Sequence, residues 1–109
     1  MRELLEGLIA KFNDKAASDP GLQEDLEGVK KTVLIELQGG PTYHFTLENG
    51  RIEGLRDGTT AKPDVTIVTD ADTLRALINR EMGPFKAYAT GKVKIKGSFE
   101  DLLRFRKFF

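Results

Sequence analysis

The chain contains no cysteine, so disulfides, thiolate metal sites and cysteine nucleophiles are excluded. Histidine and serine are also scarce, because His44 is the only histidine and Ser18 and Ser98 are the only serines. A Ser-His-Asp triad would need one of these serines beside His44, and nothing in their spacing suggests it. His44 lies on the polar side of an alternating segment, which favours a solvent-facing strand residue over a catalytic one. One histidine and scattered carboxylates also disfavour a metal site.

An excess of charge of either sign is missing too, because 17 Lys and Arg residues balance 17 Asp and Glu residues. Nucleic-acid-binding proteins usually carry a basic excess, so no nucleic-acid partner is expected. Residues 39–41, Gly-Gly-Pro, indicate a turn and not a phosphate-binding loop. No apolar run approaches the length of a membrane span, and the N-terminal residues lack the apolar core of a signal peptide. The C-terminal Lys-Phe-Phe is not a peroxisomal Ser-Lys-Leu address, so we expect a cytoplasmic protein.

The length predicts one domain over residues 1–109, with room for a buried core. Its first third is helical in pattern. Apolar residues fall on one arc of a helical wheel over residues 2–17, which predicts an amphipathic helix. Asp19 suits a helix N-cap and Pro20 suits the first helical position, so a short second helix is expected to run to about Leu26.

Alternation of apolar and polar residues then predicts three strands, at 32–38, 43–48 and 51–55. Asn49-Gly50 predicts a type I′ hairpin turn between the second and third, and Gly54 predicts a bulge. A fourth strand is expected at 65–69, followed by a helix capped by Asp70. A short helix opened by Pro84 ends at Gly91, where a left-handed cap is expected.

The last part of the chain predicts a fifth strand at 92–96 and a final helix after it. Val93 and Ile95 face one way in this strand, and three lysines face the other way. The order of elements predicts an α+β domain, with a five-stranded, mainly antiparallel sheet covered by helices on one face.

The segment from Gly91 to Gly97, Gly-Lys-Val-Lys-Ile-Lys-Gly, resembles the signature of the sterol carrier protein type 2 family. The resemblance covers roughly residues 30 to 107. It includes residues 64–78, which look like the family's central strand and following helix, and the hairpin at 47–50. Met-Gly-Pro at 82–84 stands where the family has a Met-Asn-Pro-like turn. Arg80 departs from the family, which often has glycine there, and this leaves the local turn conformation open.

This resemblance implies that the fold encloses an apolar cavity, or tunnel, between helices and sheet. It implies non-catalytic binding and intracellular carriage of a fatty acid, fatty acyl-coenzyme A, sterol or related lipid, with no cofactor and no metal. Transient contact with a membrane surface and a monomer or weak homodimer are expected. The side chains expected to line the ligand site are Phe45, Leu74, Leu77, Ile78, Met82, Phe85, Tyr88, Ala89, Val93, Ile95, Phe99, Leu102, Leu103, Phe105 and Arg106.

Several alternatives stay open at this stage. The apolar residues could pack wholly against the sheet, because no periodicity reports a void. Lys92, Lys94 and Lys96 could protect an edge strand from aggregation or bind an anionic headgroup. Arg106 could reach solvent or hold a carboxylate at the tunnel mouth. The same fold with a filled core could be a protein-interaction or dimerisation module. An enzyme that acts on a lipid is disfavoured, because the chain lacks a nucleophile or base for it.

Overall fold

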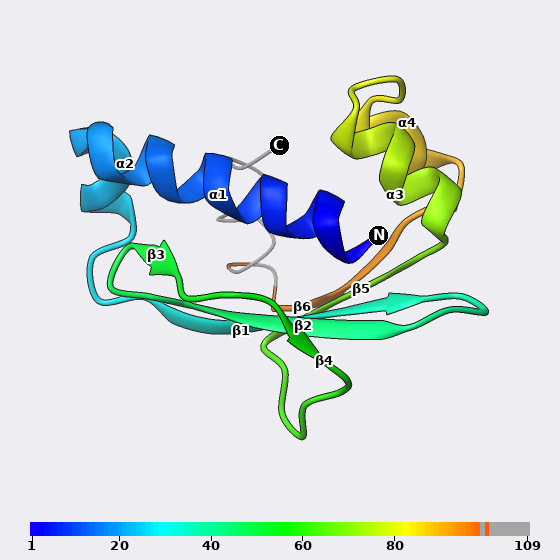
Figure 1. Ribbon diagram of the computed structural model, residues 1–109, viewed down its shortest axis with the longest axis horizontal. Helices are drawn as coiled ribbons and strands as arrows, with labels where there is room; N and C mark the ends of the chain where they lie inside the picture. Colours follow the sequence, from blue (N-terminus) through cyan, green and yellow to red (C-terminus); the bar gives the residue numbers. More distant parts are fainter. Residues whose placement is uncertain (99, 101–109) are drawn as a thin grey trace.

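The computed structural model describes residues 1–98 and 100, and its helices all lie over one face of a single sheet (Figure 1). The predicted α+β architecture is therefore confirmed. The final helix predicted after Gly97 falls mostly outside the described residues. The elements are α1 (Arg2–Ser18), α2 (Pro20–Asp25), β1 (Lys30–Leu37), β2 (Thr42–Glu48), β3 (Arg51–Ile52), β4 (Arg56–Asp57), β5 (Val65–Thr69), α3 (Ala71–Ile78), α4 (Pro84–Ala89) and β6 (Lys94–Gly97).

The sheet joins all five predicted strand segments. Its strand order is β3-β2-β1-β5-β6, and β4 pairs with β2 beside β3. Neighbouring strands are antiparallel except β1 and β5, which run parallel. The sheet is thus mixed, with the mainly antiparallel character expected from the sequence. Two parallel strands need a long connection between them, and here the chain forms β2, β3 and β4 between β1 and β5.

The third predicted strand, 51–55, is divided in two in the structure. The β2 partner of Ile52 is Leu47, and that of Asp57 is Tyr43. Between these pairs β2 advances by four residues and the opposite chain by five, so one extra residue is inserted there. This is the bulge predicted at Gly54, whose φ is 155°. The bulge breaks the hydrogen-bond ladder, which is why a continuous strand over 51–55 was wrong.

The predicted hairpin turn is confirmed by its backbone. Asn49 and Gly50 have φ values of 56° and 75°, and a type I′ turn requires positive φ at both central residues. The turn therefore fixes the register in which β2 meets β3.

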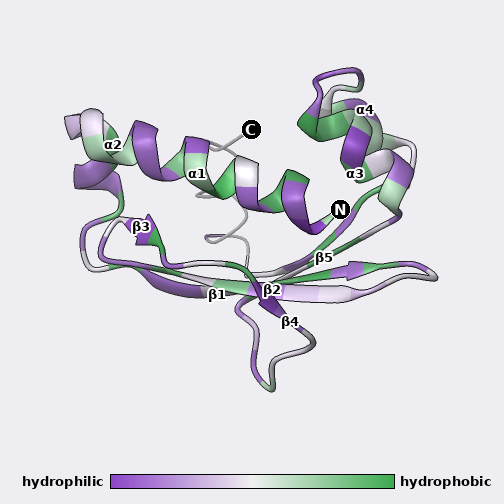
Figure 2. Ribbon diagram, in the orientation of Figure 1, coloured by the Kyte–Doolittle hydropathy of each residue, from purple (hydrophilic) through white to green (hydrophobic). Residues whose placement is uncertain are grey.

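The core lies between the helices and the sheet. Apolar residues of α1 recur along one stripe of the helix, visible as alternating hydrophobic and hydrophilic bands in Figure 2. Val33 is fully buried in the middle of β1, directly between Phe45 of β2 and Val65 of β5. The buried cluster consists of Leu5, Ile9, Ala16, Leu22, Leu26, Val33, Ile35, Leu37, Tyr43, Leu47, Ile52, Leu55, Val65 and Leu74.

The last described strand, β6, lies at one end of the strand order and begins at Lys94, two residues later than predicted. Lys94 and Lys96 are exposed on the sheet face away from the helices. Their position fits the reading of lysines on an edge strand. Gly97 lets this strand approach β5, because a Cβ there would lie 3.1 Å from the Asp64 carbonyl oxygen.

Two helices end in the same hydrogen-bonded motif. After α4, the amides of Lys92 and Gly91 donate to the carbonyls of Ala87 and Tyr88, at 2.9 and 3.2 Å. This Schellman motif needs positive φ at the residue after the cap, and Gly91 has φ 76°. The left-handed cap predicted at Gly91 is confirmed.

The end of α3 has the same motif with arginine in place of glycine. The amides of Glu81 and Arg80 donate to the carbonyls of Ala76 and Leu77, at 2.8 and 3.2 Å. Arg80 has φ 60°, so it adopts the left-handed conformation that glycine adopts without a steric penalty. The structure thus answers the question left open at Arg80: the turn forms despite the arginine.

Replacing Arg80 with glycine is expected to raise the free energy of unfolding by about 0.5–1 kcal/mol. The gain is the steric cost removed, less the extra entropy that glycine adds to the unfolded chain. Urea denaturation followed by circular dichroism measures it. Asn79→Gly is the matched control, because Asn79 has φ −81° and glycine should only destabilise there. Equal destabilisation by both variants would contradict the proposed strain.

Candidate functional site

The helix-facing surface of the sheet carries a row of apolar side chains that crosses four strands. Ile95 of β6 pairs with Ile67 of β5, Ile67 pairs with Ile35 of β1, and Ile35 pairs with Tyr43 of β2. Paired residues share a sheet face, so all four side chains lie on the side of the core. The next row contains Phe45, paired with Val33.

Burial changes along this row. Ile35 and Tyr43 are 4% and 7% exposed, whereas Ile67 and Ile95 are only partly buried. Phe45 is partly buried as well. We name Phe45, Ile67 and Ile95 the apolar platform. Ile67 belongs to an internal strand, so its exposure does not result from the sheet margin. The helices of residues 1–98 therefore cover this part of the sheet only in part.

Helix α3 rises beside the platform from a well-formed cap. The Asp70 side chain accepts hydrogen bonds from the Thr73 amide (2.7 Å) and the Thr73 hydroxyl (2.8 Å). Next to it, the Thr69 hydroxyl donates to the Lys92 carbonyl at 2.9 Å, which ties the end of β5 to the chain that leaves α4. These bonds fix the start of α3 and the chain that leaves α4 at the end of β5.

The pKa of Asp70 is lowered by its cap geometry. The Thr73 amide contributes most, then the Thr73 hydroxyl, with a smaller contribution from the charge of Lys92. The folded pKa lies below that of the unfolded chain, so the ionised cap stabilises the fold at and above neutral pH. That contribution is lost as the pH falls through the folded value. A cap for α3 therefore explains Asp70 without a catalytic role.

The structure brings some of the expected ligand-site residues together and leaves others apart. Leu74 and Val93 are buried, and Ile78 is partly buried and packs against the core. Leu77 and Met82 are half-buried. Phe45 and Ile95 belong to the platform itself.

On α4 the expected residues lie at the surface. Phe85 is 72% exposed and Tyr88 60%, and Ala89 is exposed too. These three side chains do not line a buried cavity in this conformation. Their part in ligand binding stays a prediction. Five further expected residues lie outside the described part of the chain: Phe99, Leu102, Leu103, Phe105 and Arg106.

Sequence reasoning missed two residues that matter here. Ile67 was not expected in the site, although its position opposite Ile95 in the register makes it the centre of the platform. Asn13 was also missed. Its amide nitrogen donates to the Ile52 carbonyl, and its amide oxygen accepts from the Ile52 amide, each at 2.8 Å. The signal for Asn13 was a polar residue four positions after buried Ile9, on the apolar arc of α1.

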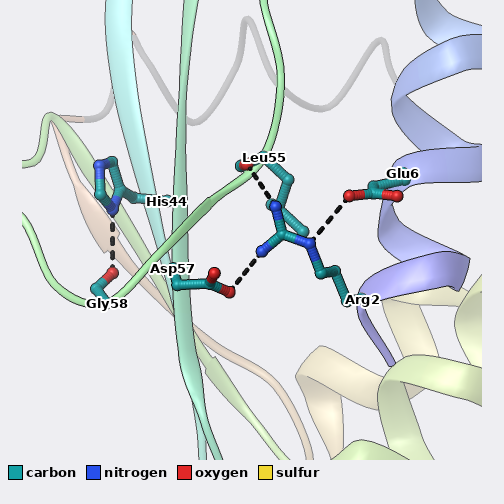
Figure 3. A network of polar contacts seen from close by, with 6 residues as sticks. All are labelled: Arg2, Glu6, His44, Leu55, Asp57 and Gly58. Atoms are coloured by element: carbon teal, nitrogen blue, oxygen red, sulfur yellow. Dashed lines mark hydrogen bonds and ion pairs between the residues drawn. The ribbon is translucent and has the colours of Figure 1, made fainter.

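The Asn13 carboxamide thus forms with the Ile52 backbone the two hydrogen bonds that a neighbouring strand would form at the edge of β3. A second set of contacts between α1 and the β3–β4 segment lies at the N-terminal end of α1. Arg2 donates to the Leu55 carbonyl at 3.0 Å, pairs with Asp57, and holds Glu6 at 2.9 Å, as Figure 3 shows. An open pocket of about 300 Å³ lies between the two sets of contacts, lined by Glu6, Ile9, Ala10, Asn13, Ile52, Glu53, Gly54 and Leu55.

His44 stands apart from the platform. It is half-buried on the sheet face opposite the helices, and its Nδ1 lies 2.9 Å from the Gly58 carbonyl oxygen (Figure 3). This contact ties β2 to the loop after β4. Within residues 1–98 and 100, no three carboxylate or imidazole side chains gather to hold a metal ion. No helix in the same part of the chain combines the length and apolar character needed to cross a membrane.

Comparison with known proteins identifies related folds. The model of the SCP-2 sterol transfer family matches residues 9–109. Among curated proteins, no relative matches the chain. The ubiquinone synthesis protein UbiJ-SCP2 has a similar structure, with a TM-score of 0.68 and 15% identity over 99% of this chain and 90% of the other. Palmitated SCP2L2 from Aedes aegypti gives a TM-score of 0.60 and 17% identity, over 94% and 91%.

A similar fold also occurs inside a larger enzyme. The stereoselective inverting sec-alkylsulfatase Pisa1 from Pseudomonas sp. matches with a TM-score of 0.61 and 26% identity. The match covers 76% of this chain but only 13% of the sulfatase. The chain thus corresponds to a small part of that enzyme.

Proposed function

The chain belongs to the SCP-2 sterol transfer family, and from this premise we propose that it carries a long apolar molecule between its helices and its sheet. Membership supports lipid binding and transfer in general. The finer proposal is that an acyl chain, as in a fatty acid or fatty acyl-coenzyme A, lies over the apolar platform. The step is physical, and no covalent chemistry is needed.

The observation that supports this proposal most is the partial exposure of Ile67. An apolar side chain on the helix-facing side of an internal strand is normally buried by the helices, as Ile35 is on the neighbouring strand. A ligand that covered Phe45, Ile67 and Ile95 would remove this apolar surface from water. Leu74 and Ile78 of α3 would form the adjoining wall, and half-buried Met82 would suit ligands of different shapes.

The energetic argument favours a long hydrocarbon. Each methylene buried contributes about 0.8 kcal/mol, so a long acyl chain offsets the entropy lost on association. The structure of palmitated SCP2L2 belongs to a protein of the same architecture, which makes palmitate a sensible first ligand to test. The described residues of the platform are uncharged, so they would recognise the chain of the ligand and not its headgroup.

The purified protein should bind an environment-sensitive fluorescent fatty acid saturably, and unlabelled palmitate should displace the probe. A sterol and a fatty acyl-coenzyme A, used as competitors in the same assay, report which class is preferred. Absence of saturable binding for all three classes would contradict carriage. It would favour an interaction module in which the same fold has a filled core.

A further inference from the structure

Lys31 of β1 is the only cation among the described strand residues that face the helices. Its register partner is Leu47 of β2, and the partner of Leu47 on β3 is Ile52. Both partners are core residues, at 1% and 7% exposure. Paired residues share a sheet face, so the Lys31 side chain leaves β1 on the side of the core.

The neighbouring lysine, Lys30, lies on the opposite face of the sheet and in a different environment. It pairs in register with Glu48, and the Lys30 Nζ lies 3.9 Å from a carboxylate oxygen of Glu48. The Lys30 side chain is 71% exposed, whereas Lys31 is half-buried. Lysine is mostly exposed in folded proteins, so a half-buried lysine on the core side of a sheet is unusual.

Lys31 lies next to the apolar platform, at the end of the sheet where the chain descends from α2 into β1 (Figure 1). Val33, two positions further along β1, shares the face of Lys31 and pairs with Phe45 of the platform. Phe45 is therefore the diagonal neighbour of Lys31. Diagonal neighbours have Cα atoms about 7–8 Å apart, within reach of a long side chain. An acyl chain that begins over Phe45 thus has its first carbon beside the Lys31 ammonium.

A carboxylate is the headgroup that matches this position. A hydrogen bond between an ammonium and a carboxylate is about twice as strong as one between neutral groups. Lys31 already has a contact within the chain, but its ammonium carries three donors, so it can keep that contact and still hold a carboxylate oxygen. In a fatty acyl-coenzyme A the same end of the acyl chain is an uncharged thioester, and a sterol offers only a hydroxyl.

Acidic residues near this end of the sheet oppose an anionic headgroup. Asp25 belongs to α2, Glu27 to the connection before β1, and Glu100 follows β6, and all three are exposed. Exposed charges are screened by salt more than half-buried ones, so this repulsion is weaker than the attraction of the half-buried lysine. Asp57, the acidic strand residue on the helix-facing side, pairs with Arg2.

We propose that the carried ligand is an unesterified fatty acid, whose carboxylate binds the Lys31 ammonium while its chain covers the apolar platform. This inference rests on the proposed carriage, and it names the ligand class and the residue that selects it. The hydrocarbon chain supplies most of the affinity. Lys31 discriminates between a fatty acid and neutral lipids of the same length. Arg106, considered from the sequence for a carboxylate, lies outside the described residues.

Palmitate and hexadecanol test this assignment, because they have the same chain length and differ in headgroup charge. The original protein should bind palmitate about ten-fold more tightly than hexadecanol. Lys31→Met keeps an unbranched side chain without the charge. It should lower the palmitate affinity by about ten-fold and leave the hexadecanol affinity within about two-fold. Lys31→Arg keeps the cation and should retain the preference for palmitate.

Lys30→Met is the matched control, because it removes the adjacent lysine from the opposite face of the sheet. It should change neither affinity, and competition with the fluorescent fatty acid measures each one. Equal losses of palmitate binding from Lys30→Met and Lys31→Met would overturn the assignment. An equal loss of palmitate and hexadecanol binding in Lys31→Met would also overturn it, because such a loss reports packing and not charge.

The ionisation of the bound headgroup gives an independent readout. Nuclear magnetic resonance of palmitate labelled with carbon-13 at its carboxyl group follows this ionisation as the pH is changed. A neighbouring ammonium favours the ionised form, so the apparent pKa of the bound carboxyl should be lower in the original protein than in Lys31→Met. Identical titrations in the two proteins would contradict the pairing.

The outcomes separate headgroup selection from carriage. If palmitate and hexadecanol bind saturably and equally, and Lys31→Met changes neither affinity, carriage stands and the role of Lys31 is refuted. If neither ligand binds saturably to the original protein, the proposed carriage fails, and the role of Lys31 fails with it.

Discussion

Replacing Asn13 with leucine is expected to lower the free energy of unfolding by about 2 kcal/mol. The substitution removes a side chain that both donates to and accepts from the Ile52 backbone, at 2.8 Å in each direction. Leucine has a similar size but offers no polar atom. The Ile52 amide and carbonyl would then lie unpaired in a part-buried position between α1 and the edge of β3.

Urea denaturation monitored by circular dichroism measures this loss. Ser18→Ala is the matched control, because the Ser18 hydroxyl donates to the Asp14 and Lys15 carbonyls of its own helix and makes no bond to another element within the described residues. It should change stability by a few tenths of a kcal/mol. The Asn13→Asp variant refines the test, since its carboxyl can donate to the Ile52 carbonyl only when protonated. Its deficit should shrink in acid, and a deficit that does not depend on pH would contradict the two-way bond.

Replacing Ile67 with tryptophan is expected to weaken fatty-acid binding at least ten-fold, or about 1.4 kcal/mol. The indole would occupy the surface over the platform that the described helices leave partly exposed, where the ligand is proposed to lie. Affinity falls because the indole fills space that the acyl chain would otherwise occupy. Displacement of the fluorescent fatty acid by palmitate measures the effect.

The control lies at the next position of the same strand. Val68 is half-buried on the sheet face away from the helices, and Val68→Trp should change affinity less than two-fold, about 0.4 kcal/mol. Thermal melts of both variants identify losses due to unfolding. Ile95→Trp makes the same test on an edge strand, where added bulk is tolerated better. Equal losses from Ile67→Trp and Val68→Trp would contradict a ligand site on the helix-facing side.

Local patterns predicted most of the fold. The strand Val65–Thr69 has the bounds that its alternation indicated, because Asp64 before it and the cap at Asp70 after it both end the pattern. Errors arose where one residue serves two elements. The amide of Lys92 closes the Schellman motif of α4, so it cannot also begin β6.

The candidate site was less predictable, for a physical reason. Alternation reveals which side chains share a sheet face, but it does not reveal how closely the helices cover that face. The exposure of Ile67 therefore had no counterpart in the sequence. The family resemblance likewise implied Phe85 and Tyr88 for the site, whereas the six-residue α4 exposes both rings and buries Ala87, so their role in binding stays a prediction.

Nuclear magnetic resonance of the protein bound to isotope-labelled palmitate tests the central claim most directly. Intermolecular nuclear Overhauser effects between the acyl chain and the side-chain methyls of Ile67 and Ile95 are expected, with Phe45 ring protons as a third contact. Contacts with Ile9 and Ile52 alone would place the ligand in the pocket between α1 and β3. That result, or the absence of any saturable contact, would contradict carriage over the apolar platform.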